Sequence, residues 1–182
     1  LVYDYCKKHI VGQDEIMEEM IILFTLYMLD PEMKFSAYLV TGPSGCGKTH
    51  SVRTICRALK LPFYEIDTTI LSQASYKGIN LSDILDPMIA SLLSQQSTLK
   101  YAKNGTIYGV VFFDEFMKKF LLNDSNNSTI ALAYEFLKLL EPGYEYNGHK
   151  LNLQFILADA MASLSDEKIT KSLLVKKIFL LN

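Results

Sequence analysis

One glycine-rich segment restricts the possible fold more than any other feature of this chain. It reads Gly42-Pro43-Ser44-Gly45-Cys46-Gly47-Lys48-Thr49 and fits the pattern G-x-x-x-x-G-K-[ST]. A short apolar run over residues 37–41 precedes it and is typical of a strand. After the loop, apolar residues recur with a helical period at Val52, Ile55, Cys56 and Leu59. The sequence therefore predicts a strand, a tight loop and a helix in succession.

A loop of this kind is suited to bind a chain of phosphates. Its glycines let backbone N–H groups point inward, and the following helix adds free N–H groups and the positive end of its dipole. Lys48 would bring a full positive charge to the β and γ phosphates, and Thr49 would offer its hydroxyl to Mg²⁺. We predict Mg-ATP as the ligand, contacted by Pro43, Ser44, Gly45, Cys46, Gly47, Lys48, Thr49 and the backbone of His50.

A second motif supplies two acids. The apolar run Val110-Val111-Phe112-Phe113 ends in Asp114 and Glu115. Asp114 is predicted to hold Mg²⁺ through its water shell. Glu115 is predicted to orient and deprotonate the attacking water. An acid adjacent to the metal-binding Asp favours hydrolysis over phosphoryl transfer to a small molecule.

The remaining segments predict an α/β class with a mostly parallel sheet, because strands and helices alternate. Strands are expected over residues 37–41, 62–67, 106–113, 153–158 and 178–181. Helices are expected over 14–29, from 49 onward, over 81–97 with an interruption at Pro87, and over 130–140. Asn147-Gly148 predicts a hairpin within residues 145–151.

Composition fits one globular domain. The chain has 182 residues, of which 49% are hydrophobic and 21% charged, and its net charge of −2 gives no overall attraction to nucleic acid or anionic lipid. The longest apolar run, residues 20–29, is too short to cross a bilayer. Its three cysteines lack metal-ligand spacing and favour a reducing compartment. We therefore expect residues 1–182 to be a cytoplasmic domain from a longer protein.

With these motifs in place, the chain resembles the large domain of AAA+ ATPases of the ClpX and HslU type, from about His9 to Asn182. The resemblance implies a P-loop fold with three α/β/α layers and a five-stranded sheet. Ile10-Val11-Gly12-Gln13 is similar to the family segment that lies against adenine, which implies contacts from Ile10 and Val11. The resemblance also implies a ring, taken to be a homohexamer, that unfolds or remodels a polypeptide, with a protease as one candidate partner.

Two further sites are implied only by this resemblance. Tyr76-Lys77-Gly78 matches the aromatic-hydrophobic-glycine pore loop that grips substrate, although Lys77 replaces the usual apolar residue. Lys177 falls where the family carries an Arg finger just before the fifth strand. Arg53 and Arg57 are the only arginines of the chain, and no C-terminal helical lid is expected within it.

Three functions therefore stay open. The first is an ATP-driven protein remodeller. The second is a motor or switch that acts on nucleic acid, which Lys77 in the pore loop would favour. The third is a scaffold that binds ATP and hydrolyses it weakly, which a missing Arg finger would favour.

Overall fold

The computed structural model describes residues 1–30, 37–66, 80–96, 105–115, 136, 138–140 and 143–159, and the backbone of 175–180. Its helices are α1 (Val2–His9), α2 (Asp14–Leu29), α3 (Lys48–Leu59) and α5 (Leu81–Gln95). Its strands are β1 (Ala37–Thr41), β2 (Phe63–Glu65), β3 (Thr106–Phe113), β4 (Glu145–Tyr146), β5 (His149–Asp159) and β6 (Val175–Leu180).

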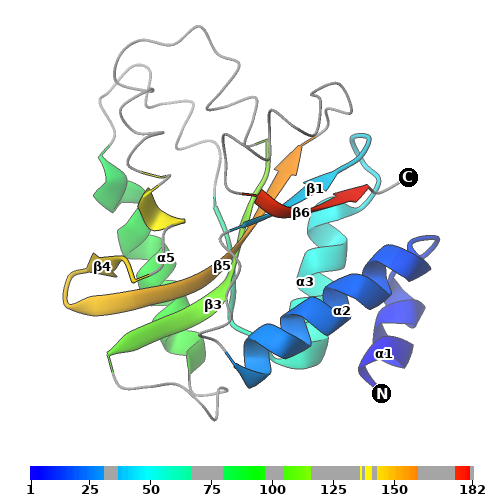
Figure 1. The fold of residues 1–182 in the computed structure, drawn as a ribbon, viewed down its shortest axis with the longest axis horizontal. Coiled ribbons are helices and arrows are strands. Elements are labelled where there is room, and N and C mark those ends of the chain that lie inside the picture. Colours follow the sequence, from blue (N-terminus) through cyan, green and yellow to red (C-terminus); the bar gives the residue numbers. More distant parts are fainter. Residues whose placement is uncertain are drawn as a thin grey trace, which may run out of the picture.

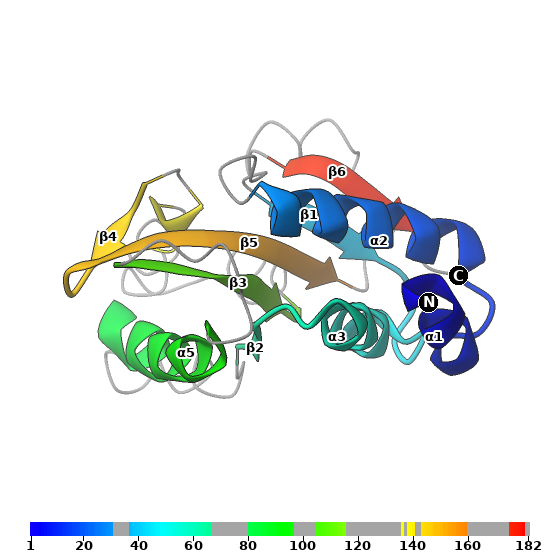
Figure 2. The ribbon, with the colours of Figure 1, turned by 90° about the horizontal axis from the view of Figure 1, so that it is seen from below.

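Five of the described strands form a parallel sheet in the order β2-β3-β5-β1-β6 (Figure 2). The short strand β4 pairs with β5 in the antiparallel direction. The predicted α/β class and the five-stranded, mostly parallel sheet are therefore confirmed.

The sheet is covered by helices on both faces, as Figure 1 shows with α5 on one side of the strands and α1, α2 and α3 on the other. Alternate residues of each strand point to opposite faces. On β1, Leu39 joins the apolar cluster under α5, whereas Tyr38 and Val40 join the cluster under α1–α3. This double burial explains why the strands read as nearly continuous apolar runs.

Most predicted boundaries agree with the structure: β1, β3 and α2 match the predicted ranges, and α3 begins one residue earlier than expected. Strand β2 is shorter than predicted. The predicted hairpin at Asn147-Gly148 is present, because β4 pairs with the start of β5 across this turn. The strand expected over 153–158 was wrong in its start, because one strand runs from His149 to Asp159 without a break. It stays whole because β3 supplies pairing partners along its length, from Lys150 opposite Thr106 onward.

The predicted interruption at Pro87 was wrong, since α5 continues through it. The residues on either side, including Leu85 and Met88, are buried in the core, and this burial offsets the one backbone hydrogen bond that proline cannot donate. The sequence did not predict helix α1. Of the helix expected over 130–140, only residues 136 and 138–139 are described as helical. None of the described helices is long and apolar enough to span a membrane.

A tyrosine of α2 reaches between two central strands. The Tyr27 hydroxyl donates to the Asn152 carbonyl at 2.6 Å and accepts from the Gly109 N–H at 3.0 Å. Gly109 also lies tightly against α5, because a Cβ atom there would come within 2.7 Å of Leu92 Cδ2. Burial raises the pKa of Tyr27 well above its ordinary value. The junction of α2, β3 and β5 is thus a buried polar contact whose groups are all paired.

Candidate active site

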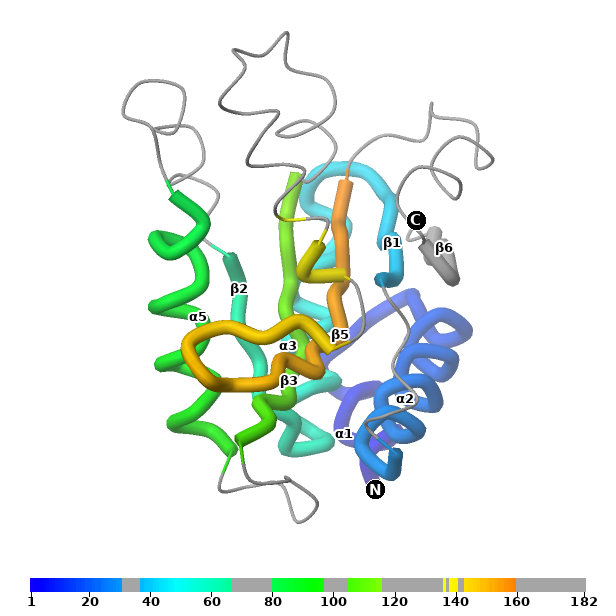
Figure 3. The backbone as a smooth tube through the Cα atoms, turned by 60° about the vertical axis from the view of Figure 1, so that its left-hand side comes forward, coloured from blue at the N-terminus to red at the C-terminus, as the bar shows by residue number. Residues whose placement is uncertain are grey.

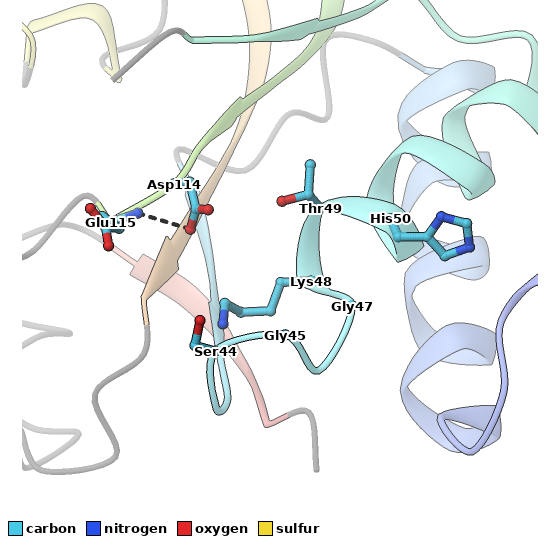
Figure 4. Close-up of a pocket in the computed structure, with 8 residues that line it drawn as sticks. All are labelled: Ser44, Gly45, Gly47, Lys48, Thr49, His50, Asp114 and Glu115. Carbon is cyan, nitrogen blue, oxygen red and sulfur yellow. Dashed lines mark hydrogen bonds between the residues drawn. The ribbon is translucent and has the colours of Figure 1, made fainter. Parts of the chain in front are cut away.

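The parallel strands bring the two predicted motifs to one edge of the sheet. Strands β1, β3 and β5 end at the same edge (Figure 3), where ligands bind in open α/β sheets. The glycine-rich loop follows β1, and Asp114 and Glu115 follow β3. Together they enclose a cavity of about 270 Å³ (Figure 4), lined by Ser44, Gly45, Gly47, Lys48, Thr49, His50, Asp114 and Glu115.

The loop backbone takes conformations that glycine permits. Gly45 and Gly47 have φ angles of +80° and +93°, where a side chain would be strained. The Gly42 N–H donates to the carbonyl of Asp159 at 3.3 Å, which ties the loop to the end of β5. The Cys46 N–H donates to the Pro43 carbonyl at 3.3 Å. The sequence thus needs glycine at these points so that the loop can close on itself.

Lys48 begins α3, and only 8% of its surface is exposed. Its ammonium group donates to the carbonyls of Gly42 at 2.9 Å and Pro43 at 3.0 Å, which holds the charge across the loop. Gly47 is the N-cap of α3 and offers no side-chain oxygen to the first-turn N–H groups. A cation and a helix N-terminus therefore face the same cavity, a combination that attracts anions.

The two acids approach the cavity from β3. Glu115 has a φ of +52°, which is uncommon for a residue other than glycine. Its N–H donates to Asp114 Oδ1 at 2.9 Å, which stabilises the tight turn at the end of the strand. Figure 4 shows the Asp114 carboxylate and the Thr49 hydroxyl turned toward each other across the cavity. Because of this turn, the adjacent carboxylates of Asp114 and Glu115 point in different directions.

These residues fit a magnesium-bound triphosphate. Mg²⁺ takes oxygen ligands and is bound in proteins by one or two carboxylates together with substrate phosphates. Asp114 and Thr49 offer such oxygens, while Lys48 and the start of α3 offer donors to phosphate. Glu115 lines the same cavity without being needed for the metal.

Four of the predicted contact residues do not line the cavity. Pro43 and Cys46 contribute to the loop through backbone hydrogen bonds. Ile10 is only 4% exposed and belongs to the apolar cluster under α1, α2 and α3. Val11 is 88% exposed. The roles of all these residues stay predictions.

The side chain of His50 has a partner that the sequence does not predict. Its Nε2 lies 2.9 Å from the carbonyl oxygen of His9, so the start of α3 is joined to the end of α1. No local sequence pattern indicates a contact between residues this far apart in the chain.

The other predicted sites lie mostly outside the described residues. Tyr76, Lys77 and Gly78 fall entirely outside them. Lys177 is described only in its backbone, which pairs with Tyr38. It lies inside β6 rather than before it, because pairing with β1 already begins at Val175.

The fold and the cavity define a P-loop nucleotide-binding domain. The sequence signature of the family described as "ATPase family associated with various cellular activities (AAA)" matches residues 38–158. The chain therefore belongs to the AAA family, whose activity in general is ATP hydrolysis.

Similar proteins carry the name ATP-dependent Clp protease ATP-binding subunit ClpX. The one from Porphyromonas gingivalis is 34% identical over 115 residues, which cover 60% of this chain and 26% of that protein. The one from Bacteroides fragilis is 27% identical over 154 residues, or 77% of this chain and 35% of that protein. The one from Azotobacter vinelandii is 40% identical over 88 residues, or 46% and 18%. The chain thus spans about a third or less of the length of these relatives.

Proposed function

We propose that this chain binds Mg-ATP in the cavity between the glycine-rich loop and the acids of β3. Lys48 and the first-turn N–H groups of α3 would bind the phosphates, and Thr49 and Asp114 would hold Mg²⁺. The observation that carries the proposal is the convergence of these groups on one cavity from β1, α3 and β3. Magnesium would neutralise charge on the phosphates together with Lys48.

Glu115 is the proposed general base for hydrolysis. It lines the same cavity and adopts the left-handed backbone conformation of the turn that follows β3. From that position it would accept a proton from the water that attacks the γ-phosphate. Asp114 would be kept from this role by its contact with the metal and by the N–H of Glu115.

The similar proteins suggest what ATP hydrolysis would drive. Their name describes an ATP-binding subunit of an ATP-dependent protease. By that similarity we propose that the full-length protein assembles as a ring, taken to be a hexamer, and unfolds or remodels polypeptides. A protease would be its candidate partner, and Tyr76-Lys77-Gly78 its candidate pore loop.

The test is Mg-ATP turnover by the full-length protein, with and without an unfolded polypeptide. Glu115→Gln should lower turnover by about 10²- to 10⁴-fold while ATP still binds. Glu145→Gln, which changes an exposed acid on β4, is the matched control and should leave turnover unchanged. Stimulation by the polypeptide that Tyr76→Ala abolishes would support remodelling.

Two results would contradict the proposal at different levels. Turnover unaffected by Glu115→Gln would remove the assigned base. Binding that needs Lys48 without any Glu115-dependent turnover would instead indicate a nucleotide-gated scaffold.

A further inference from the structure

An ion pair joins α3 to the end of strand β2. The Arg53 guanidinium donates a hydrogen bond to the Glu65 carboxylate, and its central carbon lies 5.9 Å from the centre of the Phe63 ring. Phe63 and Glu65 are two residues apart on β2, so their side chains point to the same face of the sheet. The side chain of Arg53 thus lies along the face of β2 that α3 covers.

Arg53 also lies close to a residue of the cavity. Residues four apart in a helix lie on the same face, so Arg53 follows Thr49 by about one turn along α3. Thr49 lines the cavity, and its hydroxyl is turned toward Asp114 (Figure 4). The ion pair is therefore within one helical turn of the hydroxyl assigned to Mg²⁺.

Strand β2 leads to the same edge of the sheet as β3. The two strands are parallel, and Glu65 is opposite Phe112, two residues before Asp114. The ion pair thus attaches α3 to the strand next to the one that leads to Asp114. The side chains of Arg53 and Glu65 are 50% and 36% exposed. Because ion pairs this exposed contribute little to stability, the main consequence of the contact is where it holds the helix.

We propose that Arg53 is a positioning residue for the magnesium site. Through Glu65 it holds the Thr49 face of α3 against the ends of β2 and β3, so that the Thr49 hydroxyl and the Asp114 carboxylate stay directed at one cation. This inference rests on the proposed Mg-ATP site. Neither member of the ion pair belongs to the glycine-rich loop or to the acidic motif that follows β3.

The experiment measures the Kd of ATP for the full-length protein by titration calorimetry, once with saturating Mg²⁺ and once with EDTA. The ratio of the two values reports the contribution of the cation to binding. Arg53→Gln and Glu65→Gln should each lower that contribution by about two- to fivefold, the range for one exposed ion pair, and leave the Kd in EDTA unchanged. Because both changes break the same contact, the double variant should lose no more than either single variant. Arg57→Gln, which changes an exposed arginine one turn further along α3, is the matched control and should change neither Kd.

The two single variants also separate positioning from a simple effect of charge. Arg53→Gln makes the surroundings of the site more negative, whereas Glu65→Gln makes them less negative. An electrostatic effect alone would therefore shift Mg²⁺ binding in opposite directions in the two variants. Shifts of opposite sign, or no shift in either variant, would overturn the positioning role.

Failure of this inference and failure of the proposed function give different results. Thr49→Ala should remove most of the magnesium contribution if the assigned metal site is right. If it does so while the Arg53 and Glu65 variants bind like the wild type, only the positioning role is wrong. If Lys48→Met and Thr49→Ala both leave ATP binding unchanged, the proposed ATP site itself is wrong.

Discussion

Two groups of polar residues in this domain are built in opposite ways. At the junction of α2, β3 and β5, the Tyr27 hydroxyl is buried and satisfied by Gly109 and Asn152. At the edge of the sheet, the acids of β3 and the hydroxyl of Thr49 are partly exposed and face a shared cavity. The first arrangement is complete within the chain. In the second arrangement, donors and acceptors from different elements face one cavity. This indicates that ligand binding, rather than stability, accounts for the residue types at this edge of the sheet.

The largest effect should come from the lysine of the cavity. Lys48→Met keeps most of the apolar stem but removes the charge, and we expect ATP affinity to fall by about 2–5 kcal/mol, or roughly 30- to several-thousand-fold. Titration calorimetry measures this loss. Lys8→Met, which changes an exposed lysine of α1, should have no effect. If both variants bound ATP with similar affinity, Lys48 would not be part of the binding site, and the cavity would not differ from the buried junction in this way.

At the buried junction, Tyr27→Phe should lower the free energy of unfolding by about 1–3 kcal/mol, because it leaves backbone groups of Gly109 and Asn152 without this partner. Urea denaturation measures the change, and ATP affinity should be unaltered. Tyr146→Phe removes the same atom from an exposed contact with Asp86 and should cost less. If Tyr27→Phe weakened ATP binding as strongly as it lowered stability, the two regions would not be independent.

The tight packing beside this junction gives an effect of similar size. Gly109→Ala places a methyl group against Leu92 Cδ2 and the Pro62 carbonyl, and we expect a loss of about 1–3 kcal/mol, reduced where Leu92 can shift. Combining it with Leu92→Val, which shortens the opposing side chain, should cost less than the sum of the single losses. Additive losses in the denaturation curves would show that the two positions do not interact.

Alkaline pH should lower the free energy of unfolding through two buried side chains. Burial raises the pKa of the Cys56 thiol and of Tyr27 above their ordinary values of 9.0 and 10.0. Both groups therefore stay protonated in the folded state after the unfolded chain begins to ionise. Their stabilisation is complete below pH 9 and declines as the pH rises above it, at up to about 1.4 kcal/mol per pH unit for each group.

Denaturation midpoints measured from about pH 8 to 10.5 test this decline. Cys56→Ala should remove the part of the decline in stability that begins near pH 9, the ordinary pKa of a thiol. The comparison is made relative to the variant's own stability at pH 8, because the variant starts from a lower value. A decline that is equally steep in wild-type protein and in Cys56→Ala would assign it to other groups.

The sequence predicted the sheet and the cavity well because both arise from local patterns. The glycine-rich loop and the run before Asp114 each carry their signal in a few consecutive residues, and parallel strands must bring them to one edge. The full length of β5 was harder to predict, because Asn152 and Gln154 are polar and yet buried. The short helix α1 has too few apolar residues for a clear period. The contact between His50 and His9 depends on tertiary packing, which no local pattern encodes.

The strand order also has a consequence for how the chain folds during synthesis. Strand β1 carries the loop and leaves the ribosome early, yet the strands that flank it in the sheet begin only at residues 149 and 175. Until those residues emerge, both edges of an apolar strand lack their partners. Such edges are prone to pair with other chains, and contacts between distant residues form slowly. Because β1 lies between β5 and β6, we expect the glycine-rich loop to be one of the last parts of the domain to take its final shape.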